Sequence, residues 1–160
     1  MVSPQIVMYE EEFNQISAIC ERLCREANST VVFLVDKNGQ LIASAGQTAN
    51  LDTTSLASLT AGNISATGGL AKLIGEKEFS ILFHEGERDN LHISIVASRV
   101  ILVVIFDGRS SLGLVRLRVK KASQELTVIF DNLMRKLEDP ATGSPFAEIT
   151  DEDIDNLFSD

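Results

Sequence analysis

Two cysteines are the residues of this chain best suited to redox or metal chemistry. Cys20 and Cys24 lie four positions apart on an apolar helical pattern, so both thiols face the same side of a helix. A structural zinc site needs four ligands, and no second Cys/His pair accompanies these two. Two thiols also make no disulfide framework and suit a reducing cytosol. The sequence favours packing in a hydrophobic core over a redox or metal role.

The two histidines and the paired glycines offer no clearer chemistry. His84 and His92 fall on predicted strands without a Ser or Cys nucleophile signature beside them, so we interpret them as strand-surface residues. Gly68-Gly69 lacks a preceding strand and the G-x-x-x-x-G-K-[ST] spacing of a phosphate loop. No triad order, metal spacing or paired-carboxylate cleft stands out either. The sequence predicts no catalytic residue, no metal and no cofactor, and therefore not an enzyme.

Charge divides the chain into two parts. The 14 Lys and Arg residues all precede residue 138, where 15 acids nearly balance them, and the remaining 8 acids follow from Glu138 onward. Phosphate would repel this acidic segment, which argues against nucleic acid as a partner. No apolar run approaches the ~20 residues that span a bilayer, so membrane insertion is not expected. The N-terminus also lacks the basic and apolar regions of a signal peptide, and we expect a cytoplasmic protein.

The elements that must position these residues begin with a hairpin. Residues 31–35 and 40–45 are apolar runs around Asp36-Lys37-Asn38-Gly39, where Asn-Gly predicts a type I′ turn. The first run is apolar at every position, which indicates a strand covered on both faces. Residues 78–85, 90–97 and 100–106 predict three more strands, the last being the best candidate for a central one.

Three segments show helical periodicity, ending near residues 27, 75 and 137. Together with the strands they predict an α/β (α+β) fold of order α-β-β-α-β-β-β-α. In this fold a five-stranded, mainly antiparallel sheet lies between helices. Basic residues mark the early part of the last helix, where a solvated face is the default and a docking patch for acids the alternative. These residues are Arg116, Arg118, Lys120 and Lys121.

The helix between residues 52 and 75 has an unusual composition. Its inward side is predicted to contain Leu56, Leu59, Asn63, Ala66, Leu70 and Leu73. The opposite side is small and uncharged, with Thr60, Ala61, Ile64, Ser65, Gly68 and Gly69. Each glycine weakens a helix by about 1 kcal/mol relative to Ala, which suggests that another backbone comes close here. We predict an interface on this side; a lightly charged surface or a helix broken at the glycines are the alternatives.

The chain divides into a domain at residues 1–138 and a linker with an acidic amphipathic tail at 139–160. Two prolines and a glycine within residues 139–145 predict a linker. A short detached helix follows, whose apolar residues resemble anchors for a groove on a partner. The alternative is a tail folded back onto its own domain. The anchors are Phe146, Ile149, Ile154, Leu157 and Phe158.

The order of elements resembles the Roadblock/LC7 domain family. Residues 32–42 (Val-Phe-Leu-Val-Asp-Lys-Asn-Gly-Gln-Leu-Ile), Gly46 and residues 56–63 (Leu-Ala-Ser-Leu-Thr-Ala-Gly-Asn) carry this resemblance. The segment from Met8 to Ala147, and then residues 155–158, is similar to bacterial members that regulate a small Ras-like GTPase in cell polarity and gliding motility. Each motif is loose by itself, whereas their joint order is specific.

The resemblance implies a homodimer that binds a small Ras-like GTPase in its GTP-bound form and speeds hydrolysis without an arginine finger. It implies a dimer interface at Ala57, Ala61, Ser65, Phe79, Ile81 and Phe83. It implies GTPase contacts at Thr60, Ala61, Ile64, Ser65 and Gly68 and at the five tail anchors. Concentration of the protein at a cell pole would follow. The alternatives are a scaffold that localises a GTPase or motor without changing hydrolysis, and a small-ligand sensor, which would need a polar-lined pocket.

Overall fold

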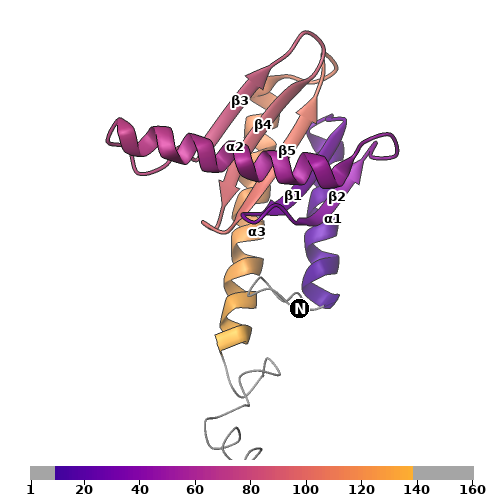
Figure 1. The fold of residues 1–160 in the computed structure, drawn as a ribbon. Coiled ribbons are helices and arrows are strands. Elements are labelled where there is room, and N and C mark those ends of the chain that lie inside the picture. The colour runs from indigo at the N-terminus through magenta and orange to yellow at the C-terminus, as the bar shows by residue number, and fades with distance from the viewer. Residues whose placement is uncertain (1–9, 139–160) are drawn as a thin grey trace, which may run out of the picture.

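The computed structural model of the protein describes residues 10–138, which form three helices and one five-stranded sheet (Figure 1). The predicted order of eight elements is confirmed. They are α1 (Glu10–Glu26), β1 (Val31–Asp36), β2 (Leu41–Gly46), α2 (Thr53–Leu73), β3 (Ile81–Glu85), β4 (Asn90–Val96), β5 (Val100–Phe106) and α3 (Leu112–Glu138). The predicted linker and tail lie outside the described residues. Of the helices in this part of the chain, none is long and apolar enough to cross a membrane.

The sheet is antiparallel throughout, with the spatial order β2-β1-β5-β4-β3. β1 and β5 lie side by side near its centre, paired from Val31 with Ile105 to Asp36 with Val100. Every residue of β1 is buried, and so is every residue of β5 except Ile105, which is half-buried. The fully apolar sequence runs therefore did indicate strands that are covered on both faces.

Helices cover the two faces of the sheet unequally (Figure 1). α1 and α3 pack on one face, where Val32 and Leu34 meet the larger core that includes Phe130. α2 crosses the other face, where Val31 and Phe33 belong to a smaller core. The alternation arises because successive side chains of a strand point to opposite faces. Each fully buried Leu or Phe stabilises the fold by about 1.5–3 kcal/mol.

Ion pairs add polar links between α1 and α3. Arg22 pairs with Glu125, and Lys136 pairs with Glu12, whose carboxylate is buried. The hydrogen bond from Lys136 holds the pKa of Glu12 below its usual value. These links fix the register of the two helices along their shared face of the sheet.

The hairpin turns differ from the sequence prediction. The prediction of a type I′ turn at Asn38-Gly39 is wrong. That turn needs a positive φ at both residues, and of the two only Gly39 has one, of 92°. The Asp36 carboxylate accepts hydrogen bonds from the backbone N–H groups of Asn38 and Gln40 at 2.9 and 3.0 Å, which holds a three-residue loop instead. Positive φ at both central residues occurs in the β4–β5 turn, at Ala97 (54°) and Ser98 (57°).

The cysteines are core residues of α1, as the sequence favoured. Cys20 is fully buried, Cys24 is nearly so, and both thiols are free. Desolvation raises the pKa of Cys20 to about 12, and the neighbouring Cys24 adds to this shift. Because the thiolate is the nucleophile and metal ligand, such a thiol is chemically inert at neutral pH.

Candidate functional site: the outer face of α2 and the edge of β3

The start of α2 is fixed by the side chain of Asp52, which caps the helix. Asp52 accepts hydrogen bonds from the Ser55 backbone N–H at 3.1 Å and from the Ser55 hydroxyl at 2.7 Å. These bonds lower the pKa of the exposed Asp52 carboxyl. The helix ends at Leu73, followed by Gly75 with a φ of 81°. Gly68-Gly69 therefore does not break the helix.

The orientation predicted for α2 is wrong. Leu59, Leu70 and Leu73, predicted to face inward, are 71%, 60% and 84% exposed. Ala57 and Thr60 are buried instead, and Ala61 and Ile64 of the small side pack on the smaller core. Leu56, which was also predicted to face inward, does pack there, whereas Ser65 and Gly69 of the small side are exposed.

A close approach between the first hairpin and α2 explains this orientation. A Cβ added at Gly39 would lie 3.2 Å from the Ser58 Cα and 3.6 Å from the Ala61 Cβ. Larger side chains on this side of α2 would push the helix away from the hairpin turn. Part of the small-residue pattern thus serves packing within one protomer.

The outer face of α2 remains almost uncharged, because Lys72 is the only charged residue of the helix. We define the outer face as Leu59, Gly62, Ser65, Ala66, Gly69, Leu70 and Leu73, all of which are exposed. A Cβ added at Gly62, Gly68 or Gly69 would meet none of the described residues within 4 Å. Packing against residues 10–138 therefore does not explain these glycines, each of which weakens the helix by about 1 kcal/mol.

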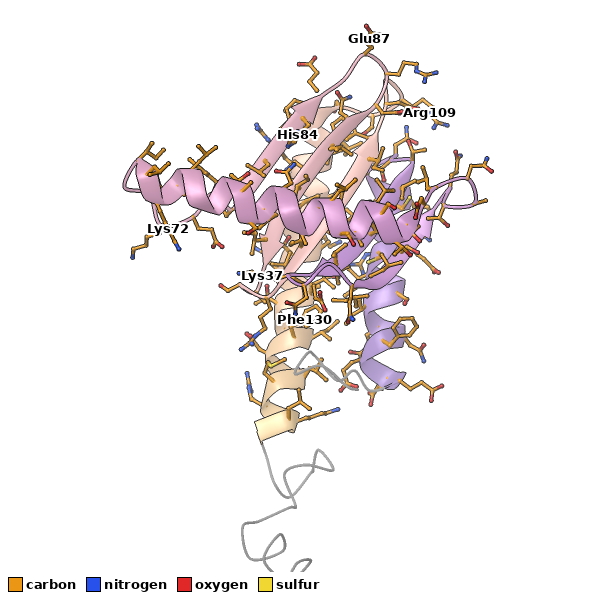
Figure 2. The ribbon with its side chains drawn as sticks, viewed as in Figure 1. Lys37, Lys72, His84, Glu87, Arg109 and Phe130 are labelled. Atoms are coloured by element: carbon orange, nitrogen blue, oxygen red, sulfur yellow. The ribbon has the colours of Figure 1, made fainter. Side chains whose placement is uncertain are left out.

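β3 forms an open edge of the sheet beside the end of α2. Among the described strands it pairs only with β4, so no strand of residues 10–138 pairs with the backbone groups on its other side. Ile81 is 55% exposed and Phe83 is 37% exposed, although the Phe83 ring stacks on Phe106 at 6.2 Å. The Lys72 end of α2 projects beyond this edge (Figure 2). Exposed apolar edge strands promote pairing with another chain unless they are covered.

The structure places the predicted site residues in three groups. Ser65, Ile81 and Phe83 are exposed and Gly68 is partly exposed on the α2 and β3 surface. Ala57 and Thr60 are buried against the sheet, Ala61 and Ile64 pack on the core below α2, and Phe79 is half-buried just before β3. The five tail anchors lie outside the described residues. Binding by any of these residues remains a prediction.

Sequence reasoning missed four exposed apolar side chains: Leu59, Leu70, Leu73 and Ile74. The signal that could have found them is the absence of charge around the whole helix. A helix with one charged residue in 21 has no side suited to water, so each side requires cover. Three of the leucines that the prediction assigned to the core lie on one uncharged side of the helix, and small residues such as Ala57 lie on the other.

The histidines divide between surface and interior. His84 is exposed, as predicted. The prediction for His92 is wrong, because its side chain is 1% exposed and faces α3. Desolvation, aided by the charge of Arg116, lowers its pKa. Within residues 10–138, no group of three or more Cys, His, Asp or Glu side chains could hold a metal ion.

Residues 16–106 match the family model of the Roadblock/LC7 domain. The chain belongs to the Roadblock/LC7 family. Among solved structures, it is 72% identical to Myxococcus xanthus MglB, with a TM-score of 0.76 over 79% of this chain and 96% of that one. It is 33% identical to the gliding protein MglB of Thermus thermophilus, with a TM-score of 0.76 over 82% of this chain and 99% of that one.

A third MglB, described as having a tetrameric arrangement, is 32% identical, with a TM-score of 0.76 and the same coverage. Comparison with curated proteins found no significant match. The similarity to MglB therefore rests on solved structures that cover about four fifths of this chain. It confirms the resemblance read from the sequence motifs.

Proposed function

We propose that the protein is a homodimeric regulator of a small Ras-like GTPase of the MglA type, and that it accelerates GTP hydrolysis in cell polarity and gliding motility. The observation that carries this proposal is the 72% identity to M. xanthus MglB over 96% of that chain. The uncharged outer face of α2, with glycines that no packing against residues 10–138 explains, supports it. Such a surface suits close contact with another polypeptide.

Self-association is proposed to occur edge to edge at β3. Two β3 strands related by a twofold axis would satisfy each other's backbone groups and form one continuous sheet. The projecting end of α2 would then lie over the sheet of the partner protomer (Figure 1). This arrangement would cover Leu70, Leu73 and Ile74, which water surrounds in a single protomer. The remaining outer face of both α2 helices would form the GTPase-binding surface.

Activation is proposed to proceed without an arginine finger. The outer face of α2 offers no arginine, and Lys72 lies at its projecting end (Figure 2). Arg109, in the loop after β5, is held by the Asp107 carboxylate, which its Nε contacts at 3.1 Å. This pairing raises the pKa of Arg109 and restrains its guanidinium. An uncharged surface can still favour the hydrolysis-competent arrangement of the GTPase switch loops.

A phosphate-release assay tests this proposal. We expect the purified chain to accelerate hydrolysis by a GTP-loaded MglA-type GTPase by about tenfold or more, and Arg109→Ala to retain that stimulation within about twofold. Arg99, in the β4–β5 turn, is the other candidate for a finger, and Arg99→Ala should also retain the stimulation within about twofold. Binding with an unchanged rate would identify a scaffold instead. A stimulation reduced about 1,000-fold by Arg109→Ala, with binding intact, would reveal a finger.

The tail is proposed to contribute GTPase affinity or nucleotide exchange through its apolar anchors. We expect removal of residues 139–160 to weaken GTPase binding or exchange, while light scattering shows an unchanged dimer. The physical reason is that the tail offers five large apolar side chains and the rest of the interface lies on α2. Equal affinity and equal exchange rates for the full and shortened chains would assign the tail to solubility alone.

A further inference from the structure

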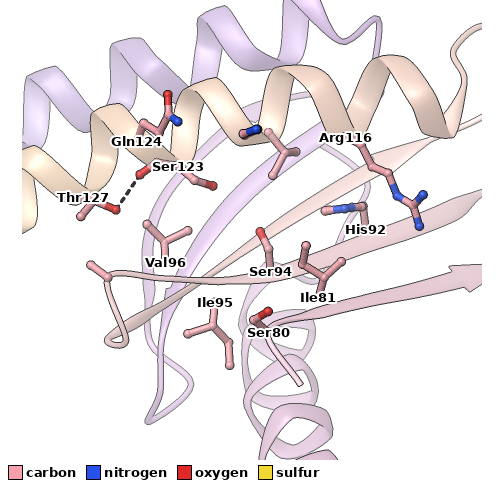
Figure 3. A pocket seen from close by; sticks show the side chains of 13 residues that line it. Ser80, Ile81, His92, Ser94, Ile95, Val96, Arg116, Ser123, Gln124 and Thr127 are labelled. Carbon is pink, nitrogen blue, oxygen red and sulfur yellow. Dashed lines mark hydrogen bonds between the residues drawn. The ribbon is translucent and has the colours of Figure 1, made fainter. Parts of the chain in front are cut away.

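A cavity with a mostly apolar surface and several polar side chains lies between α3 and the β3–β4 side of the sheet, on the face opposite α2 (Figure 3). Its volume is about 530 Å³, within the range of about 300–1,000 Å³ typical of small-molecule sites. It arises because α3 packs over β5 and β4, while β3 extends the sheet beyond this cover. His92, Ser94 and Val96 of β4 line the cavity, and they alternate along the strand with side chains that face α2.

Two buried side chains in the cavity have polar atoms without a hydrogen-bond partner among the described residues. His92 is 1% exposed, and neither ring nitrogen is paired. Ser94, two residues along β4, is 4% exposed, and its hydroxyl oxygen is also unpaired. Both side chains line the cavity (Figure 3). Buried polar groups are nearly always hydrogen-bonded, and leaving one unsatisfied destabilises the folded chain.

The charge of the lining has one sign. Arg116 and Lys120 of α3 border the cavity, and among residues 10–138 no Asp or Glu lines it. This occurs in a chain whose net charge is −9. Burial and Arg116 lower the pKa of His92, so its ring is neutral near pH 7 and keeps one N–H donor. The cavity thus combines hydroxyl, imidazole, guanidinium and ammonium donors.

Apolar side chains provide most of the surface that lines the cavity. Ile81, Val96 and Val119 present methyl groups beside the polar ones. Phosphate oxygens accept several charge-assisted hydrogen bonds at once, and a guanidinium fork matches their geometry. A ligand with a phosphate group and a compact apolar body would satisfy both parts of the lining.

We propose that this cavity binds a small organic phosphate, a phosphomonoester with a compact apolar body. Arg116 and Lys120 neutralise the phosphate charge, and His92 and Ser94 bond its oxygens. The site lies on the face of the sheet opposite the outer face of α2 and uses none of the residues of that outer face, although Ile81 of β3 belongs both to the cavity lining and to the proposed dimer edge. Phosphate binding does not depend on GTPase regulation, and separate assays test the two.

The test uses phenyl phosphate as the probe and the two histidines as reporters. The full chain, labelled with ¹⁵N-histidine, is titrated at constant ionic strength, so that general screening of surface charge stays fixed. We expect the imidazole signal of His92 to shift with saturation and a dissociation constant below about 1 mM, while exposed His84 stays unchanged. Inorganic phosphate should bind more weakly and benzyl alcohol should not shift His92, because each lacks one half of the ligand.

Matched variants of α3 separate a built site from general attraction. Arg116→Gln should weaken phenyl phosphate binding at least about tenfold. Lys121→Gln, an exposed position outside the lining, should change it by less than about twofold. Equal losses in the two variants, or no saturable His92 shift up to about 10 mM probe, would overturn the proposal.

The acidic tail is the alternative occupant, and the same signal distinguishes it. Removal of residues 139–160 should leave the His92 spectrum and the phenyl phosphate affinity unchanged. A His92 shift caused by the truncation itself, or probe binding only after truncation, would assign the cavity to tail carboxylates and overturn the proposal. His92→Phe keeps a ring of similar size and should abolish binding while circular dichroism shows a folded chain.

Discussion

Replacing Leu73 with arginine is expected to disrupt the proposed dimer and leave a monomer. Leu73 is 84% exposed in one protomer and lies on the part of α2 that projects beyond β3. In the proposed dimer this side chain is covered by the partner, where an unpaired charge is strongly unfavourable. We expect self-association to weaken at least about 100-fold, or about 2.7 kcal/mol. Sedimentation equilibrium over a concentration series measures this change.

The variant should leave the fold of the protomer unchanged. A cation in the last turn of a helix interacts favourably with its dipole, and the leucine side chain makes little contact within the protomer. Leu117→Arg, at a 61% exposed position of α3, is the matched control and should remain dimeric. Equal dissociation constants for wild type, Leu73→Arg and Leu117→Arg would reject the proposed interface.

Replacing Gly46 with alanine is expected to cause the largest loss of stability among single methyl additions to the glycines. Gly46 ends β2 with a φ of 93°, a conformation that costs an L-residue about 1–2 kcal/mol. The added Cβ would lie 2.3 Å from the Thr30 carbonyl oxygen and 3.0 Å from the Cys24 Sγ. The Thr30 oxygen cannot move easily, because it accepts a hydrogen bond from the Gln47 N–H at 3.0 Å.

Together, strain and overpacking should lower the free energy of unfolding by about 3 kcal/mol. Urea denaturation at a fixed protein concentration, with linear extrapolation, measures the loss. Gly75→Ala is the matched control, because Gly75 also has a positive φ, of 81°, but open space around its missing Cβ. It should lose only about 1 kcal/mol. Similar losses at the two positions would show that the close contact at Gly46 is not a significant constraint.

Burial of the central strands could be predicted because their sequence pattern has one physical meaning. Residues 31–35 and 100–106 are apolar throughout, and a strand of this kind is stable only where other elements cover both of its faces. The helices covering one face were equally clear, since Phe130 and the other buried residues of α3 recur at spacings of three and four. Local turn signals were weaker. Asn38-Gly39 favoured a type I′ turn, but the Asp36 carboxylate stabilised a longer loop.

The sequence by itself determined the order of elements, the coverage of β1 on both faces and the central position of β5, because these follow from local periodicity and burial. The family followed from the resemblance of its motifs. Only the tertiary structure decided which side of α2 faces the sheet. Leucines and small residues surround that helix, so its periodicity selects no side, and the approach of Gly39 to Ser58 and Ala61 settles the choice. The burial of His92 likewise depends on α3 covering β4. Contacts between distant segments, absent from any local pattern, created both candidate sites.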